Sequence, residues 1–386
     1  MTSSPHHRPA PARTVVTAVF FAFAIGLGLW AGSIPALMRR TGLDVTGLGL
    51  ALTLHTAAYI AAMAGGGQLA RIVSPRRLMQ AALLANVPCF GLVFTATSAP
   101  GLTVALVAIG LSAGLLDLAM NTEGTAVERE MRRPVLLGMH AAASAAFGIG
   151  ALAGSLIATQ AGPQVCALLV AGVNLPVALA VHRLGPRPDA AVPPLATPRQ
   201  AGAGRGILLI GIVLGLTIAG EMAAQMWSAR FLERQAGELA AYAGAGATFF
   251  AGFQAVVRLA GDRLRHRFGD RRVILLSLAI AAAGFATVAT SDWFVQSLLG
   301  FALVGLGTAC VVPCCFALIA QRAAHQAAAA LGTASLVAGA LRLPAPLALG
   351  AAAATWSEAH AFAGVAVGML VALWLARPAS EEPAAH

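Results

Sequence analysis

Long stretches of apolar residues, separated by short polar segments, dominate this chain of 386 residues. Many stretches run for more than 18 residues without a charge, which is long enough for a helix to cross the hydrocarbon core of a bilayer. Breaks at charged residues, Pro and Gly divide the chain into twelve predicted membrane-spanning helices. These helices cover residues 14–38, 47–70, 78–97, 100–121, 135–159, 164–182, 206–231, 241–260, 273–290, 293–320, 327–350 and 359–376.

The chain also repeats itself at an offset of 195 residues, which is close to half its length. The identical pairs at this offset are Ser33/Ser228, Leu37/Leu232, Arg39/Arg234, Gly42/Gly237, Gly49/Gly244, Thr53/Thr248, Gly66/Gly261, Leu69/Leu264, Arg76/Arg271 and Arg77/Arg272. The predicted organisation is therefore a tail (1–13), a six-helix bundle (14–182), a Pro- and Arg-rich connector (183–205), a second six-helix bundle (206–376) and a tail (377–386). A duplicated membrane domain is typical of secondary transporters.

Composition supports a membrane protein independently of the pattern. Hydrophobic residues make up 58% of the chain, charged residues only 10%, and the mean hydropathy is +0.79. A soluble core of this size does not require so many apolar residues. We therefore predict an all-α polytopic membrane protein in which twelve helices form two pseudo-symmetric halves.

The charged residues orient the predicted helices. The formal net charge is +10, and every basic residue other than histidine is an arginine. With both termini inside, nineteen of the arginines fall on inner segments, against Arg39, Arg40 and Arg234 outside. Arginines on short loops at one face bind anionic membrane lipid, so the charge does not indicate nucleic acid. We expect a bacterial inner-membrane protein with both termini in the cytoplasm and the first span retained as an anchor.

The fourth predicted span carries an acidic residue within the membrane. Asp117 and Asn121 lie one helical turn apart and share a face with Gly110 and Gly114, which leave room beside them. A charged group in hydrocarbon costs about 2.5–3.5 kcal/mol, so it must line water or pair internally. Asp117 is thus a candidate proton-coupling residue and Asn121 a candidate substrate ligand. The alternative is that Asp117 pairs with a loop arginine and only holds helices together.

The seventh predicted span carries a second carboxylate. Glu221 is followed one turn later by Gln225, and Trp227 and Ser228 stand near the outer end. A carboxylate, an amide and an aromatic plane are groups that bind a polar organic solute. Glu221 is therefore a second proton-coupling candidate, and Glu221, Gln225 and Trp227 are candidate substrate ligands. A purely structural glutamate is the alternative.

Four further ionisable residues fall inside predicted spans. His140 on the fifth span and Arg342 near the middle of the eleventh are substrate-site candidates, with a packing histidine as the alternative for His140. Arg342 requires a counter-charge, so it should meet Asp117, Glu221 or an anionic solute. His55 is expected to pack, and Arg258 to extend toward the neighbouring loop.

The prolines and cysteines say less about function than the ionisable residues do. Five prolines are expected to interrupt the third, sixth, tenth and eleventh spans: Pro88, Pro176, Pro313, Pro344 and Pro346. Pro313 and the Pro344/Pro346 pair are hinge candidates, and the alternative is that neighbouring groups satisfy the freed backbone atoms. The five cysteines read as small hydrophobic residues without a metal or cofactor site. Gly150 and Gly154 predict close helix packing within a monomer.

Two basic turns resemble the loop motif of the major facilitator superfamily, which runs roughly Gly-x-Leu-x-Asp-Arg-x-Gly-Arg-Arg. They are residues 66–77, after the second span, and residues 261–272, after the eighth. The resemblance implies twelve helices in two halves and a gating role at the inner face for Arg76, Arg77, Asp262, Arg271 and Arg272. The acidic residue of the motif is absent, because Arg71 occupies its position.

Further residues resemble the fucose-permease-like branch of that superfamily. They are Gly110, Gly114, Asp117, Asn121, Glu128 and Arg129 around the fourth span, Met139, His140, Ser144 and Gly148 in the fifth, Glu221, Trp227 and Ser228 in the seventh, and Gly305, Gly307 and Pro313 in the tenth. Met226 stands where relatives often carry an aspartate, which removes one candidate proton carrier.

Three classes of function compete. The buried ionisable residues favour proton-coupled uptake of a small polar organic solute. Proton-driven export of amphipathic compounds is the alternative, and a cavity rich in aromatic residues would favour it. A membrane enzyme or receptor is disfavoured, because the sequence has no P-loop, metal-ligand cluster or extramembrane domain.

Overall fold

The computed structural model describes residues 9–70, 72–185, 204–323 and 326–379, nearly all of them helical. The tail segments 1–8 and 380–386, the bulk of the connector (186–203) and Arg71 lie outside the described residues. The first half contains α1 (Pro9–Thr41), α2 (Val45–Leu69), α3 (Pro75–Thr95), α4 (Ala99–Met131), α5 (Leu136–Gln160) and α6 (Gln164–Leu184). The second contains α7 (Arg205–Ala236), η1 (Gly237–Tyr242), α8 (Ala245–Phe268), α9 (Asp270–Ala289), α10 (Phe294–Thr308), α11 (Val311–Arg322), α12 (Ala327–Arg342), α13 (Ala345–Thr355) and α14 (Glu358–Ala379).

Two predicted spans are each broken into two helices. The tenth consists of α10 and α11, which meet just before Pro313, and the eleventh of α12 and α13, which meet at Leu343 and Pro344. A proline has no N–H to donate to the carbonyl four residues earlier, so the ladder is interrupted at these points. The expected interruptions at Pro88 and Pro176 are wrong, because α3 and α6 continue through them.

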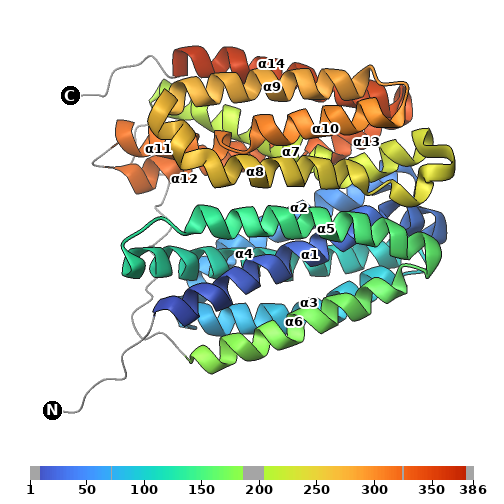
Figure 1. The fold of residues 1–386 in the computed structure, drawn as a ribbon, viewed down its shortest axis with the longest axis horizontal. Coiled ribbons are helices and arrows are strands. Elements are labelled where there is room, and N and C mark those ends of the chain that lie inside the picture. Colours follow the sequence, from blue (N-terminus) through green and yellow to red (C-terminus); the bar gives the residue numbers. More distant parts are fainter. Residues whose placement is uncertain (1–8, 71, 186–203, 324–325, 380–386) are drawn as a thin grey trace.

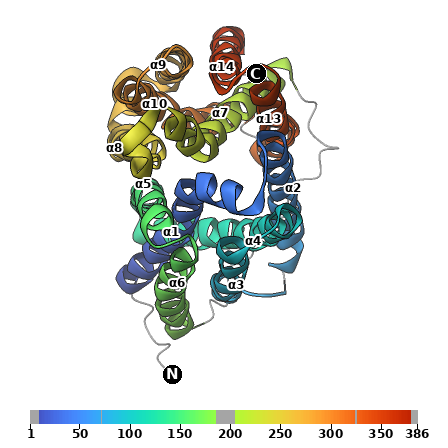
Figure 2. The ribbon, with the colours of Figure 1, turned by 90° about the vertical axis from the view of Figure 1, so that its right-hand side faces the viewer.

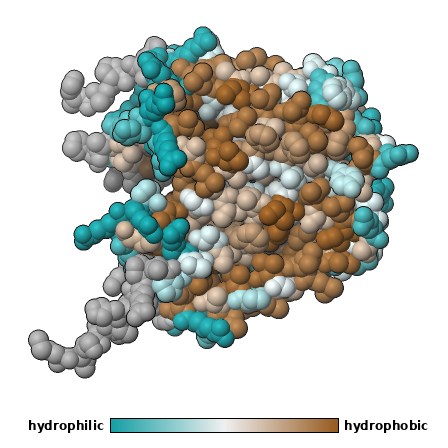
Figure 3. Space-filling view, viewed as in Figure 1, coloured by the Kyte–Doolittle hydropathy of each residue, from teal (hydrophilic) through white to brown (hydrophobic). Residues whose placement is uncertain are grey.

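The predicted all-α fold is confirmed. Eleven helical segments within the described residues are long and apolar enough to cross a membrane, with the broken pairs α10–α11 and α12–α13 counting as one segment each. The remaining member of the twelve is α8, whose last turns carry Arg263, Arg265 and Arg267 and lower its hydropathy. Figure 3 shows apolar side chains across the middle of the molecule and polar ones gathered at its two ends.

The two halves lie side by side along their length. In Figure 1 the helices α1–α6 occupy the lower part of the molecule and α7–α14 the upper part, and Figure 2 shows the same division from the end. We call the end where α1 begins and α14 ends the terminal face, and the opposite end the far face. In the first half, Gly150 and Gly154 pack against backbone atoms of Ile25 and Leu29 of α1, which confirms the predicted packing within the monomer.

The halves meet at the far face through contacts that obey the internal repeat. A Cβ at Gly244, which caps α8, would lie 2.0 Å from the carbonyl oxygen of Ala151 in α5. A Cβ at Gly49 in α2 would lie 2.7 Å from the carbonyl oxygen of Pro346 in α13. Gly49 and Gly244 are related by the offset of 195 residues, and so are Ala151 and Pro346. We infer from these two equivalent backbone contacts between the halves that the far face is closed.

A second repeated pair strengthens this closure. The hydroxyl of Thr248 donates a hydrogen bond to the carbonyl of Gly148 (2.8 Å). The hydroxyl of its repeat partner Thr53 accepts one from the backbone N–H of Leu347 (3.1 Å). Each bond joins one half to the other, so the repeated sequence positions coincide with the interface between the halves.

An ion pair also joins the halves at the far face. Arg39 at the end of α1 pairs with Glu233 at the end of α7. Behind it, Arg230 lies 3.2 Å from the buried Glu358 at the start of α14. Because Arg39 is 60% exposed, its pair contributes at most modestly to stability.

Candidate functional site

A cavity of about 240 Å³ lies between the halves at mid-helix depth. Helices α1, α2, α4, α5, α7, α8 and α12 contribute to its wall. The apolar lining is rich in aromatic and Met side chains, among them Phe20, Phe23, Trp30, Phe147, Met120, Met222 and Met226. The polar lining consists of His55, Thr56, Tyr59, Asp117, His140, Ser144, Glu221, Gln225, Gln254, Arg258 and Arg342.

Asp117 is held by a group of neighbours from three helices. Tyr59 of α2 donates its hydroxyl to Asp117 Oδ2 (2.6 Å), and Asn121 Nδ2 donates to Asp117 Oδ1 (3.0 Å). Asn121 Oδ1 lies 3.1 Å from His140 Nε2 of α5. Because the Asn121 amide uses its N–H groups on Asp117, its oxygen is the acceptor and His140 Nε2 the donor. The sequence-predicted residues Asp117, Asn121 and His140 thus form one network, which we call the Asp117 group together with Tyr59.

Arg342 faces this group from the other half. It is the last residue of α12, at the break before Pro344, and its guanidinium carbon lies 5.0 Å from the centroid of the Tyr59 ring. Within the described part of the chain it has no hydrogen bond or ion pair, and its Nε is buried without a partner. The proline break therefore ends the helix where Arg342 reaches the cavity, and the guanidinium stacks on an aromatic face.

His55 adds a fixed acceptor to the same side of the cavity. Its Nδ1 lies 2.9 Å from the carbonyl oxygen of Leu106, and its ring lies 5.1 Å from that of Trp30. A carbonyl only accepts, so Nδ1 carries a proton, and in the neutral form of the ring Nε2 is an acceptor.

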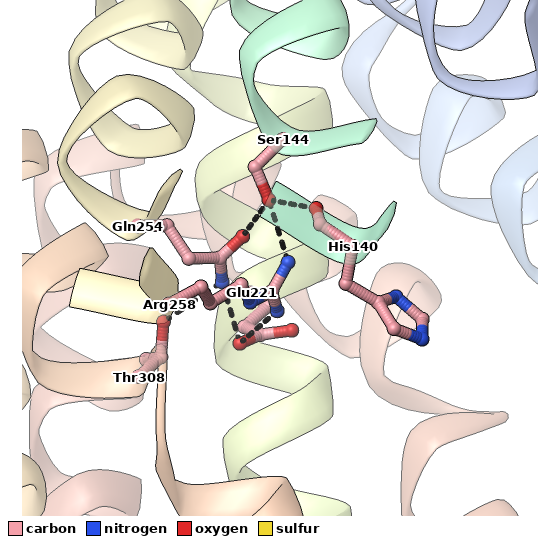
Figure 4. Close-up of polar contacts among 6 residues, drawn as sticks. All are labelled: His140, Ser144, Glu221, Gln254, Arg258 and Thr308. Carbon is pink, nitrogen blue, oxygen red and sulfur yellow. Dashed lines mark hydrogen bonds and ion pairs between the residues drawn. The ribbon is translucent and has the colours of Figure 1, made fainter. Parts of the chain in front are cut away.

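Glu221 belongs to a second hydrogen-bond network (Figure 4). Gln254 Nε2 donates to Glu221 Oε1 (2.8 Å), and Arg258 Nη2 lies 3.9 Å from the same oxygen. Arg258 Nη1 donates to the hydroxyl of Ser144 (2.6 Å), which lies 3.3 Å from Gln254 Oε1. Thr308 of α10 also accepts from Gln254 (3.4 Å). We call these five residues the Glu221 group.

The Glu221 group connects the two halves. Ser144 lies on α5 of the first half, whereas Glu221, Gln254 and Arg258 lie on α7 and α8 of the second. A charged side chain away from water is tolerated when it is paired and hydrogen-bonded, and Glu221 and Arg258 meet both conditions. A movement of one half against the other must therefore change the bonds of this pair.

Other predicted residues fall in different places. Gln225 lines the cavity, whereas Trp227 is only 2% exposed, belongs to the apolar core and is absent from the lining. Two residues along a helix correspond to a rotation of about 200°, which turns Trp227 away from the face of Gln225. Pro313 lies in the first turn of α11, beside the helix break.

The two basic turns differ in their surroundings. Arg76 is buried, with its Nε 2.8 Å from Glu123 and its Nη1 donating to the carbonyls of Leu184 and Gly185. Its repeat partner Arg271 is exposed, as are Arg77 and Arg272. Also in the second copy, Arg265 contacts Asp270 (2.7 Å) and Asp262 (3.8 Å).

Sequence reasoning missed several members of the cavity. It did not identify Gln254, and it expected Arg258 to extend to a loop. The available signal for Arg258 was its place within a predicted span, between the apolar residues Val257 and Leu259, where a charge requires a partner. Its partners Glu221 and Ser144 come from other helices, so only the tertiary packing identifies them.

The fold is that of the major facilitator superfamily. The solved structure of the nucleoside transporter NupG superposes with a TM-score of 0.74 at 12% identity, over 96% of this chain and 100% of that one. The human organic anion transporter MFSD10 superposes with a TM-score of 0.66 at 16% identity, over 97% and 100%. No family model matches the chain.

Sequence relatives support a transporter of this superfamily. An uncharacterised transporter of Sinorhizobium fredii is 28% identical, over 87% of this chain and 89% of the relative. An uncharacterised MFS-type transporter of Yersinia pestis is 27% identical, over 93% of both chains. The membrane protein MosC of Rhizobium meliloti is 26% identical, over 82% of this chain and 81% of the relative.

Proposed function

We propose that this protein is a secondary active transporter that couples the movement of a small polar organic solute to protons by alternating access. The observation that carries the proposal is the central cavity, in which two carboxylates and two arginines meet between two related halves. Binding at the midplane between structural repeats is the arrangement by which such transporters expose one site to either side. The repeat-related closure of the far face supports the same interpretation, because one closed end is what alternating access requires.

Asp117 is the proposed proton carrier. Its two oxygens accept from Tyr59 and Asn121, neither of which is a cation, and no arginine lies within ion-pair distance among the described residues. A membrane carboxylate in this setting is a functional residue by default. Glu221 already has a cationic partner in Arg258, so we assign it to solute contact and to the contact between the halves, and keep it as the second proton candidate.

The proposed solute ligands line the cavity or hold residues that do. Gln225, His140 and Arg342 line it directly, and Asn121 positions Asp117 and His140. The loop arginines Arg76, Arg77, Arg271 and Arg272, with Asp262, are proposed to act in gating at the terminal face, and Pro313 as a hinge at the break between α10 and α11.

The proposed orientation places the terminal face in the cytoplasm of a bacterial inner membrane. The arginine excess on that side supports it. Cysteine labelling of a Cys-less variant at Ser98, at the far face, and at Ala190, in the connector outside the described residues, tests it. Ser98 should react with an impermeant reagent from outside. Reaction at position 190 without reaction at 98 would refute the orientation.

Export of amphipathic compounds is the second candidate, and the aromatic lining favours it. Phe20, Phe23, Trp30 and Phe147 make the wall more apolar than a site for a fully polar solute needs. Solute-induced proton movement in proteoliposomes separates the two candidates. In uptake, added solute carries protons into the vesicle with it, whereas in exchange export protons leave as solute enters. A protein that moves solute without any proton flux would contradict proton coupling in both directions.

A further inference from the structure

Four charged side chains line the cavity. Glu221 and Arg258 contact each other, whereas Asp117 and Arg342 differ in how many hydrogen-bond partners they have. This inference rests on the proposed function, because it takes the cavity to be the solute site. Glu221 and Arg258 are partners at 3.9 Å and share further bonds with Gln254 and Ser144. That pair needs no further charge.

Asp117 has hydrogen-bond partners within the protein, whereas Arg342 has none among the described residues. Both oxygens of Asp117 accept a hydrogen bond within its own group. The donors of Arg342, in contrast, have no protein acceptor among the described residues, and its contact with Tyr59 uses only the face of the guanidinium. Nε is buried, so the N–H groups of the two terminal nitrogens are the ones that remain available in the cavity wall.

The chemistry that suits these N–H groups is a planar anion. A guanidinium presents its donors in a fork that matches a carboxylate through two parallel hydrogen bonds. A neutral hydroxyl or amide accepts from single donors of Arg342 and leaves the cation without a counter-charge. An anion at Arg342 adds one negative charge to the site that contains Asp117, and a proton bound by Asp117 balances that charge.

The rest of the wall restricts the body of the solute. Beyond the polar groups it consists of aromatic rings and Met side chains, such as Phe20, Phe147 and Met222. The free Nε2 of His55 accepts one hydrogen bond from a donor. The volume of about 240 Å³ lies below the roughly 300–1,000 Å³ of pockets for drug-sized ligands.

We propose that the solute is a small organic monoanion, a carboxylate on an apolar or aromatic body, whose charged group binds Arg342 while a proton accompanies it. Transport of this kind is electroneutral, because one anion and one proton cross together.

The test uses the purified full chain and measures ligand-dependent thermal stability. The probes are monocarboxylates from acetate to phenylpropionate, each compared with its primary amide, which has a similar shape and no charge. At least one carboxylate should stabilise the protein, and its amide should not. Arg342→Gln should weaken that carboxylate roughly ten- to hundredfold, as expected for loss of a charge-assisted hydrogen bond. Arg342→Lys should retain part of the affinity. Arg129→Gln, at an exposed arginine at the end of α4, is the matched control and should bind as the parent does.

Three outcomes would overturn the inference: an amide that stabilises as well as its acid, undiminished carboxylate binding in Arg342→Gln, or no stabilisation by any carboxylate in the panel. A neutral solute accumulated on a pH gradient would overturn it while leaving the proposed function intact. Carboxylate binding without any proton-driven transport would contradict the proposed function while leaving the carboxylate site at Arg342 intact.

Discussion

Closure of the far face depends on glycine where the halves touch, and Gly244→Ala tests this dependence. A Cβ at position 244 would lie 2.0 Å from the carbonyl oxygen of Ala151, and ordinary contact begins at 3.4 Å. The two backbones must therefore separate by about 1.4 Å, or neighbouring atoms must shift. Overpacking of this kind costs about 1–3 kcal/mol. The ratio of closed to open far face should then fall by roughly 5- to 150-fold, since each 1.4 kcal/mol is a factor of ten.

The assay is a distance measurement between spin labels on the two halves at the far face. Arg40 and Glu238 are exposed there and accept labels in a Cys-less background. The parent should give a short, narrow distance distribution, and Gly244→Ala should add a longer component. Gly252→Ala is the matched control, because Gly252 lies on the same helix with open space around its missing side chain.

The reasoning fails if Gly244→Ala and Gly252→Ala give the same distance distribution. It is supported further if Gly49→Ala, at the repeat-equivalent contact with Pro346, behaves like Gly244→Ala.

Other substitutions test the charges. Arg76→Gln leaves a fully buried carboxylate behind and should lower the free energy of unfolding by about 3–5 kcal/mol, whereas the exposed Arg77→Gln should change it by about 0.5 kcal/mol or less; equal losses in a denaturation assay would contradict this. In a double-mutant cycle, the losses in free energy of unfolding caused by Glu221→Gln and Arg258→Gln should fall short of additivity by about 0.5–3 kcal/mol. Strict additivity would show that the two side chains do not interact. Arg39→Gln should cost less than about 1 kcal/mol, because its pair is solvent-exposed; a larger loss of stability would mean that this ion pair itself holds the far face closed.

The sequence predicted most of the architecture, because membrane spans are long and their ends carry charges, Pro or Gly. The predicted range 164–182 corresponds to α6 (Gln164–Leu184), and the breaks near Pro313 and Pro344 followed from the missing proline N–H. The internal repeat also had structural meaning that the sequence alone did not give. Gly49 and Gly244 matched at the right offset, but only the structure places both at the contact between the halves.

The site was predictable in part. An ionisable residue in a membrane span is conspicuous, so Asp117, Glu221 and Arg342 were identified from the sequence, and all three line the cavity. The direction in which a side chain points is harder to predict. A helix that is apolar on all sides has no polar face from which its orientation could be inferred. Trp227 was for this reason assigned to the site, although it is buried in the core. Arg258 was assigned to the loop, because its partners lie on helices distant in the sequence.

The central claim is that a proton carried by Asp117 drives the solute, and Asp117→Asn in proteoliposomes tests it most directly. Asparagine keeps the size and the hydrogen-bonding capacity of the side chain but removes its titration. With the solute that elicits proton movement in the parent, the variant should lose accumulation against a gradient on an imposed pH difference. Exchange of labelled for unlabelled solute between two filled compartments should persist, which shows that the variant is folded and binds. An Asn variant that still concentrates the solute on a pH difference alone would contradict the account.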